Sequence, residues 1–391
     1  MITTLEGDII SIVKASLLDT VPDLSKEFDP KEAYVLAVKH QIVPLIYYGL
    51  AKTDKLGVAG TKFLMSTANL TQYSAIQLEE AENFFDRLDK AEIPYLKMKG
   101  TILKKLYRYP EMRMMSDIDV YAKMDRYEEI KAILTDLGYT YKTESNHEII
   151  WEKGKIVFEL HKRLIPSYTK DLFSYFGDDP WDRLTRVDKN RFEYKMTEND
   201  TYIYLFTHFA KHYRDGGIGI KFLTDFYVYE KNNSLDYQYI ENELNKIGML
   251  EFYKNTKRVL DVWFFDKEGD EITDFITGKI FASSTYGEKK AKLEAEALRL
   301  AQANKNAKAG KRKRKLQMIF PPYQQMCGKY PFLKGWAILL PLMWVVRIIS
   351  ALFKKKGGSA IASLNDLDKV TNEQIERYDA ELHYVGIPYN F

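Results

Sequence analysis

Two aspartates separated by one residue are the first feature of this sequence that could carry chemistry. Asp117 directly precedes the apolar run Ile118-Asp119-Val120-Tyr121, which contains Asp119 and predicts a β-strand. Alternate residues of a strand face the same side, so we expect both carboxylates to point the same way. Two like charges this close resist burial unless a cation neutralises them, and oxygen ligands favour Mg²⁺ or Mn²⁺. We therefore expect a divalent-metal site, although such a pair taken alone is more often a solvated turn or a helix cap.

A third carboxylate lies in the apolar segment from Lys155 to His161. Glu159 stands in the middle of this expected strand, where a buried glutamate needs a partner. If the strand lies beside that of the aspartate pair, Glu159 completes a cluster of three carboxylates. The alternatives are an ion pair with Lys162 or Arg163, or outward exposure. Alternation places His161 on the face of Glu159, where we expect it to orient a ligand.

A loop with a lysine and a glycine precedes the aspartate pair. Lys99-Gly100-Thr101 follows a short extended segment, and a glycine lets a phosphate approach the backbone. The helix expected to follow would present free N–H groups to an anion. Lys99 and Arg113 are basic residues close to this loop, and Ser116 directly precedes the aspartate pair. For Arg113 an ion pair with an acid of the same unit is an equal alternative.

Further polar residues recur one helical turn apart downstream. His208 and His212 share a face of one expected helix, but no nearby cysteine or histidine completes a zinc site. We expect them to line a cleft or to satisfy core hydrogen bonds. Lys221 and Asp225 are again one turn apart, and they either face a ligand or pair with each other.

The elements around these residues predict an α+β fold, in which a mixed sheet is flanked by N-terminal and C-terminal helical regions. Helical periodicity is strong over residues 77–91 and 126–137. Short apolar or alternating runs predict strands over residues 93–98, 118–121, 139–143, 147–151 and 155–161. We expect four parts: a helical region (1–75), an α/β core (76–165), a helical domain (166–300) and a tail (301–391).

The sequence resembles the bacterial family described as uncharacterised nucleotidyltransferase, of the polymerase-β-type superfamily. The motifs that carry the resemblance are Leu96-Lys97-Met98-Lys99-Gly100, Arg113-Met114-Met115-Ser116-Asp117-Ile118-Asp119-Val120 and Phe158-Glu159-Leu160-His161. Similar segments extend it over most of the chain: residues 40–45, His208 and His212, residues 221–225, Phe320-Pro321-Pro322 and Tyr330-Pro331. One departure is Gly100-Thr101, where the superfamily usually has Gly-Ser.

The resemblance implies an enzyme that moves a nucleoside monophosphate from an NTP to an acceptor and releases pyrophosphate. Asp117 and Asp119 would bridge two metal ions, and Glu159 would join them at the one that activates the acceptor hydroxyl. The residues that would contact the nucleotide are Lys99, Gly100, Thr101, Arg113, Ser116, Lys221 and Asp225. The acceptor stays open between a sugar, a protein side chain, a small metabolite and an RNA end, and the oligomeric state is open too. The alternatives are a non-catalytic nucleotide-binding regulator or membrane-proximal adaptor, and an enzyme that modifies a nucleic-acid end.

Charge is unevenly distributed along the chain. Residues 301–364 contain no Asp or Glu but 13 of the 58 basic residues, which leaves 45 basic and 55 acidic residues elsewhere. Residues 336–353 are nearly all apolar, yet Pro341 and Arg347 interrupt them, so a membrane span is not expected. The segment suits a helix lying on an anionic membrane surface, whereas packing on the protein body is the alternative that we favour and a nucleic-acid partner is a third.

Cysteine usage and the start of the chain bear on the compartment. Cys327 is the single cysteine, which fits a reducing environment. The first residues lack a basic start followed by an apolar run, so no signal peptide is expected. We therefore expect a cytoplasmic protein, with the inner face of the membrane as an alternative site through the tail.

Overall fold

The computed structural model describes residues 2–284, 287–304, 307–323, 326–327, 330–333, 335–353 and 366–387. Two compact units divide the chain. The first comprises Met1–Tyr213, Gly217–Gly287 and Val385–Ile387, and the second comprises Arg214–Gly216, Glu288–Tyr384 and Pro388–Phe391. The four-part division expected from the sequence stays a prediction.

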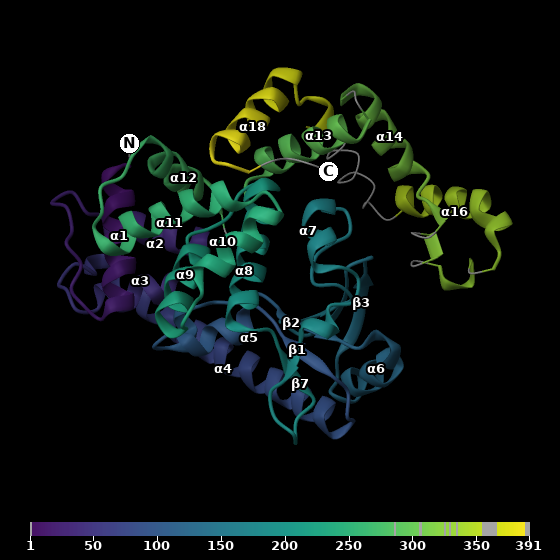
Figure 1. Ribbon diagram of the computed structural model, residues 1–391, viewed down its shortest axis with the longest axis horizontal. Helices are drawn as coiled ribbons and strands as arrows, with labels where there is room; N and C mark the ends of the chain where they lie inside the picture. Colours follow the sequence, from purple (N-terminus) through teal and green to yellow (C-terminus); the bar gives the residue numbers. More distant parts are fainter. Residues whose placement is uncertain are drawn as a thin grey trace. The chain divides into compact units, whose positions relative to one another are not determined.

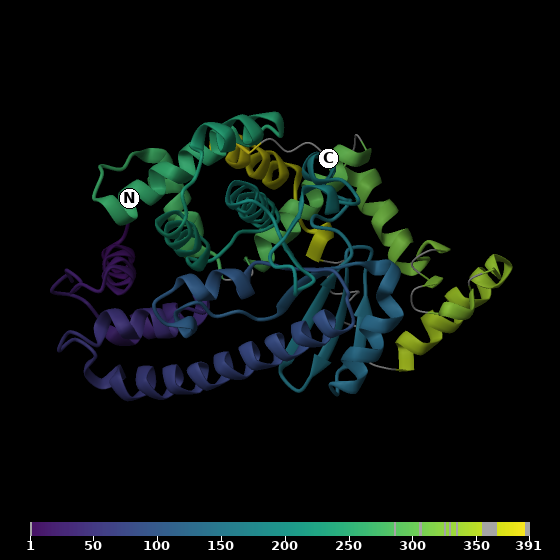
Figure 2. The same ribbon diagram turned by 60° about the horizontal axis from the view of Figure 1, so that its bottom comes forward.

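Four helices form the N-terminal part of the first unit. They are α1 (Thr4–Leu18), α2 (Pro30–His40), α3 (Val43–Leu50) and α4 (Gly60–Lys90). Asp29 caps α2 as expected, because its side chain accepts the N–H of Lys31 and Pro30 occupies the first turn. Helix α4 is much longer than the expected segment 77–91, because no glycine or proline interrupts residues 61–90. Figure 2 shows α4 running as one helix from the N-terminal helices to the sheet.

A seven-stranded mixed sheet follows in the order β3-β4-β5-β2-β1-β7-β6. The strands are β1 (Tyr95–Lys97), β2 (Ile118–Ala122), β3 (Thr140–Glu144), β4 (Glu148–Lys153), β5 (Ile156–His161), β6 (Thr185–Arg186) and β7 (Glu193–Lys195). Strand β2 pairs antiparallel with β1 and parallel with β5, so the sheet is mixed. The α+β fold expected from the sequence is confirmed.

Strands β6 and β7 extend the sheet beyond the expected strands, within a region expected to be helical. Strand β7 pairs parallel with β1, with Tyr95 opposite Glu193. Asp89 at the end of α4 holds this segment, because it accepts the backbone N–H of Phe192 at 2.6 Å and the Nε of Arg191 at 2.8 Å. Anchoring by distant residues is not visible in local periodicity, which is why the sequence pattern missed these short strands.

One face of the sheet carries the hydrophobic core. Ile118 and Val120 of β2 and Phe158 and Leu160 of β5 are buried there with Phe84 of α4 and residues of α6 (Tyr127–Asp136). Figure 1 shows α4 and α6 on this side of the sheet and α8 on the other. Because side chains of a strand alternate, the polar residues between these apolar ones face the opposite side.

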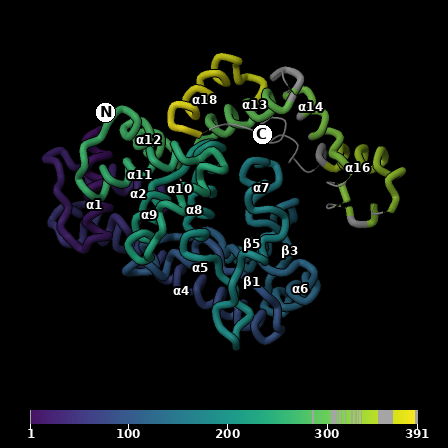
Figure 3. Tube along the Cα trace, in the orientation of Figure 1, coloured from purple at the N-terminus to yellow at the C-terminus, as the bar shows by residue number. Residues whose placement is uncertain are grey.

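Helices α8 (Glu198–Arg214) and α9 (Lys221–Asn232) lie over that opposite side (Figure 1). The other helices of this part of the chain are α5 (Gly100–Leu103), α7 (Lys170–Phe176), α10 (Tyr237–Lys246), α11 (Leu250–Phe265) and α12 (Glu271–Ala282). Helices α8 to α12 form the bundle coloured teal to green in Figure 3. The buried His40 at the end of α2 ties the N-terminal helices to this bundle, because its Nδ1 accepts the N–H of Ile220.

The second unit holds α13 (Lys289–Asn304), α14 (Ala307–Ile319), α16 (Leu340–Phe353) and α18 (Asn372–Tyr384). Arg377 of α18 pairs with Glu294 of α13 at 3.0 Å. Among the residues described, no helix is long and apolar enough to cross a membrane. Several lysines of the expected basic tail lie outside the described residues: Lys305, Lys329, Lys334, Lys354, Lys355 and Lys356.

Candidate active site

A cavity of about 310 Å³ lies between the polar face of the sheet and helices α8 and α9. Eleven of the thirteen residues singled out from the sequence line it: Lys99, Arg113, Ser116, Asp117, Asp119, Glu159, His161, His208, His212, Lys221 and Asp225. The two others, Gly100 and Thr101, are buried and do not line this cavity. Residues from the loop after β1, from β2, from β5 and from two helices therefore meet in one place.

Strand register brings the carboxylates together. Asp119 of β2 lies opposite Glu159 of β5 in the parallel pair, and Tyr121 lies opposite His161. Asp117 directly precedes β2 and lines the same cavity. The expected neighbourhood of the two strands is therefore observed, and the three acids share one side of the sheet.

Asp119 is almost completely buried, with 4% of its surface exposed. Its Oδ1 accepts hydrogen bonds from Lys99 Nζ at 2.7 Å and from His161 Nε2 at 2.7 Å. Burial raises the pKa of Asp119, but Lys99 and His161 outweigh burial and hold this pKa well below its ordinary range. Asp119 is therefore a carboxylate at neutral pH, and the lysine occupies the position of its counter-ion.

Nearby positive groups compensate the other two acids less than they compensate Asp119. Burial, and then the charges of Asp117 and Asp119, raise the pKa of Glu159 to about 9. Burial and the charge of Asp119 also raise the pKa of Asp117. The alternative partners of Glu159 are engaged elsewhere, since Lys162 pairs with Glu144 and Arg163 with Asp178. The cluster thus has a deficit of positive charge, which a divalent cation would relieve.

Arg113 and Asp225 form a buried ion pair. Arg113 donates from Nε to Asp225 Oδ1 at 3.2 Å and from Nη2 to Oδ2 at 3.0 Å. Tyr107 also donates its hydroxyl to Asp225 Oδ1 at 2.8 Å. Of the two roles considered for Arg113, the ion pair is the one observed, and Asp225 pairs with Arg113 rather than across one helix turn with Lys221.

Lys221 lines the same cavity as the three acids. The residue is buried, with 8% of its surface exposed, at the start of α9. Burial, and then the nearby Arg113, lower the pKa of Lys221 to about 8. An anion entering the cavity would favour the charged form of this lysine.

The geometry at Gly100 differs from the expected phosphate loop. A Cβ at Gly100 would lie 2.8 Å from Arg113 Nη1 and 2.9 Å from Met115 Sδ, so the residue is glycine because these side chains pack against it. The hydroxyl of Thr101 donates to the Met98 carbonyl at 2.8 Å. Helix α5 has only four residues, which leaves little of the expected helix N-terminus. Contact of Gly100 and Thr101 with a triphosphate stays a prediction, and this arrangement does not favour it.

Lys99 adopts an unusual backbone conformation. Its φ is +44° and its ψ is −108°, a region that costs a non-glycine residue about 1–3 kcal/mol. The turn directs its side chain to Asp119 at 2.7 Å. Strain concentrated at one residue of a polar cavity is typical of functional sites.

His208 and His212 lie on α8 with their ring centroids 4.4 Å apart. Burial and the charge of Lys99 lower the pKa of His208, so its ring is neutral. Within the described residues, two groups have the spacing of metal ligands, and neither includes these histidines. Their position agrees with the expected role in lining the cleft.

Three polar residues of the cavity were not singled out from the sequence: His147, Glu148 and Lys211. His147 and Glu148 stand where β4 begins, and Glu148 lies opposite His161 in the antiparallel pair of β4 with β5. Burial, and then the neighbouring His161, lower the pKa of His147 to about 2. The signal for these residues is the turn at Gly154, because a tight hairpin fixes which residues of the two strands face each other.

Comparison with known families agrees with this geometry. The model of a family described as uncharacterised nucleotidyltransferase matches residues 26–265, which is more than half of the chain. The chain belongs to this uncharacterised nucleotidyltransferase family. The match includes the sheet, the three acids and helices α8 to α11, and it ends before the resemblance expected at Phe320-Pro321-Pro322 and Tyr330-Pro331. No curated protein and no solved structure matches the chain.

Proposed function

We propose that this nucleotidyltransferase uses Mg²⁺ or Mn²⁺ to transfer a nucleoside monophosphate from an NTP to an acceptor hydroxyl. The observation that carries the proposal is the register of β2 and β5, which sets Asp119 beside Glu159 with Asp117 in the same cavity. Three carboxylates are an all-oxygen donor set, which Mg²⁺ and Mn²⁺ prefer. Bound there, the metal would neutralise the acids and the triphosphate together.

The reaction requires one bond to form and one to break. The acceptor oxygen attacks the α-phosphorus of the NTP, the bond from this phosphorus to the bridging oxygen breaks, and pyrophosphate leaves. Burial and the neighbouring acids disfavour the carboxylate form of Glu159 when no metal is bound. A metal ion in the cluster would favour that form, and Glu159 would then be placed to accept the proton of the acceptor hydroxyl. Lys221 would stabilise the negative charge of the phosphates.

The ion pair of Lys99 with Asp119 would stabilise the site before a metal binds. The ammonium group of Lys99 neutralises Asp119 at 2.7 Å, where a buried carboxylate without a partner would be costly. A metal ion at Asp119 would release Lys99 from this pair. The lysine would then be available to a phosphate oxygen of the substrate.

Transfer of a label tests the proposal. Cell extract, Mg²⁺ and the purified protein are incubated with NTPs labelled at the α-phosphate, and Asp117→Asn with Asp119→Asn serves as the inactive variant. Labelling of one class of acceptor by the wild type alone supports nucleotidyl transfer. Nucleotide binding without any transfer favours the regulator, and labelling of RNA or DNA ends alone favours a nucleic-acid-modifying enzyme.

For the tail, we propose that α16 binds an anionic membrane surface. Large apolar side chains are exposed at the start of this helix. The surface of Leu342 in α16 is 59% accessible, and that of Ile338 just before α16 is 85% accessible. Residues 301–364 carry basic but no acidic residues, which favours anionic lipid. Helices with this combination lie in the plane of a membrane interface.

Flotation with liposomes tests the membrane proposal. We expect the protein to float with vesicles that contain anionic lipid and to lose this binding in Ile338→Asp with Leu342→Asp. Val58→Asp, which changes an exposed valine of the first unit, is the matched control. Absence of flotation with anionic vesicles contradicts the proposal and leaves packing on the protein as the alternative.

A further inference from the structure

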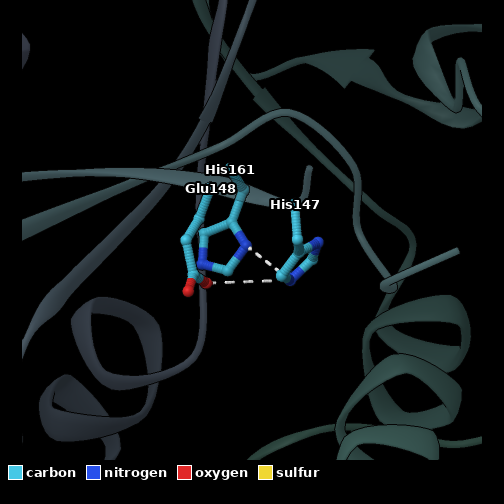
Figure 4. A group of neighbouring side chains, drawn as sticks. All are labelled: His147, Glu148 and His161. Atoms are coloured by element: carbon cyan, nitrogen blue, oxygen red, sulfur yellow. Dashed lines mark hydrogen bonds and ion pairs between the residues drawn. The ribbon is translucent and has the colours of Figure 1, made fainter. Parts of the chain in front are cut away.

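His147 and Glu148 face the cavity but take no part in the proposed transfer. They stand beside His161, with Glu148 directly opposite it in the strand pair. Figure 4 shows the three side chains converging, with His147 turned toward both others. His161 Nδ1 lies 3.2 Å from His147 Nε2, and His147 Nε2 lies 4.0 Å from a carboxylate oxygen of Glu148. The ligand atoms of all three lie within 4.8 Å of one another.

The hydrogen bond at the far side of His161 assigns its tautomer. Nε2 lies 2.7 Å from Asp119 Oδ1, and a carboxylate can only accept, so Nε2 carries a proton and the tautomer with this single proton has its lone pair on Nδ1. The lone pair of Nδ1 is therefore directed toward His147. A histidine that donates one ring N–H to a carboxylate and offers the other nitrogen outward is the arrangement found in metal sites.

Ligand spacing agrees with a small divalent ion. Two nitrogens bound at about 2.05 Å with tetrahedral angles are separated by about 3.3 Å. The two histidine nitrogens are 3.2 Å apart, so they need almost no movement. Glu148 needs a small rotation to approach, and 29% of its side chain is accessible, which leaves it room.

We propose that His147, Glu148 and His161 bind a divalent transition-metal ion of the zinc type, at a site distinct from the three carboxylates. Two imidazoles and one carboxylate are a donor set for Zn²⁺, Co²⁺ or Mn²⁺, whereas Mg²⁺ prefers oxygen alone. The three ligands come from the paired ends of β4 and β5, so the sheet holds them together. The competing arrangement needs no ion: His147 Nε2 carries a proton and donates it to His161 Nδ1.

His161 links the proposed transition-metal site to the site of the three carboxylates. His161 would bind the transition metal through Nδ1 while its Nε2–H holds Asp119 Oδ1. An ion at this site therefore fixes the orientation of Asp119. The inference stands on its own geometry and does not require the proposed transfer reaction.

Cobalt provides the test, because its absorption reports geometry and ligand type. The full-length protein is stripped with a chelator, given excess Mg²⁺ to occupy the carboxylates, and titrated with Co²⁺. We expect one equivalent to bind with the visible absorption of a tetrahedral or five-coordinate site, and Zn²⁺ to displace it. Absence of these bands, or binding that Mg²⁺ abolishes, overturns the proposal.

Variants locate the ion. His147→Ala and Glu148→Gln should each weaken Co²⁺ binding at least about tenfold. Asp117→Asn and the surface variant His383→Ala should leave it unchanged. Unchanged binding in His147→Ala, or its loss in Asp117→Asn, contradicts the assignment.

Folding controls accompany these variants. The melting temperature of each metal-free variant is compared with that of the wild type. If His147→Ala does not fold, X-ray absorption of the zinc-loaded wild type decides, because two imidazole ligands are expected and none would overturn the site.

Discussion

Asp119 of β2 and Glu159 of β5 are register partners in a parallel strand pair, so their carboxylates leave the sheet on the same side. Only Asp119 has a cation within hydrogen-bond distance, Lys99, among the partners described for these two acids. Burial and the repulsion from the other two acids therefore raise the pKa of Glu159 to about 9. A bound divalent metal would stabilise the carboxylate form of Glu159. The stability of Glu159 variants with and without metal therefore tests the site.

Glu159→Gln should stabilise the metal-free protein and weaken its stabilisation by Mg²⁺, relative to the wild type. In the wild type the folded pKa lies above the unfolded value of 4.5, so stability falls as pH rises from 4.5 toward 9. Without metal at pH 7, the variant should be more stable than the wild type, on the order of 2 kcal/mol. Mg²⁺ should raise the melting temperature of the wild type but much less that of the variant.

The control for this measurement is Glu152→Gln. Glu152 is on the adjacent strand β4, pairs with Lys142 and does not line the cavity. It should leave both melting temperatures nearly unchanged. A Mg²⁺ response that is equal in the wild type and Glu159→Gln would exclude this glutamate as a ligand.

Gly100→Ala should destabilise the protein by about 1–3 kcal/mol, because the new Cβ would overlap Arg113 and Met115. Gly278→Ala is the matched control, since Gly278 lies in α12 and a Cβ there meets nothing within 4 Å. The control should be neutral or stabilising by up to about 1 kcal/mol. Urea unfolding measures both, and equal stability of the two variants would contradict the packing role of Gly100.

Asp225→Asn should cost about 3–5 kcal/mol, because it leaves the buried guanidinium of Arg113 without its partner. Arg113→Met with Asp225→Asn should cost less than the sum of the two single variants. Glu128→Gln, at an exposed carboxylate that pairs with the exposed Lys131, should cost at most about 1 kcal/mol. Additive free energies of unfolding in the double variant would show that the two residues are not coupled.

His40 should make stability depend on pH. Burial lowers its pKa from 6.5 to about 4, so its ring is neutral in the folded state. The unfolded state binds the proton more readily, so the contribution is complete above pH 6.5 and is lost as pH falls toward 4, by about 3 kcal/mol. His40→Asn, which keeps an acceptor for the N–H of Ile220, should remove this part of the pH dependence.

The exposed His383 supplies the comparison for His40. His383→Asn changes a histidine whose side chain is 60% accessible, and it should keep the pH profile of the wild type. A profile that is identical in the wild type and in His40→Asn would contradict the neutral buried histidine.

The local sequence pattern correctly predicted which side chains of a strand share a face, because this depends only on alternation along the strand. Asp117, Asp119, Glu159 and His161 could be placed on one face because apolar residues between them mark the buried side. The adjacency of β2 and β5, although anticipated, depended on long-range pairing that periodicity does not encode. His147 and Glu148 were missed although their signal is local, because the turn at Gly154 sets Glu148 opposite His161.

Residues with several available partners were the hardest to predict. Sequence spacing suggested an ion pair between Asp225 and Lys221, which is one helical turn away. In the fold, Arg113 of a distant loop forms a bidentate pair with Asp225 instead. Gly100 likewise has its partners, Arg113 and Met115, more than ten residues downstream. Such contacts depend on the path of the loop between β1 and β2, which carries no repeating pattern.

The most direct test of the central claim compares NTPs labelled at the α-phosphate with NTPs labelled at the γ-phosphate, using the wild type, Asp117→Asn and the control Asp125→Asn. Asp125 is exposed just after β2, so its variant should behave as the wild type. We expect Mg²⁺-dependent transfer of the α-label to an acceptor, no transfer of the γ-label, and loss of transfer in Asp117→Asn alone. Transfer of the γ-label, or full α-label transfer by Asp117→Asn, would contradict nucleotidyl transfer at these carboxylates.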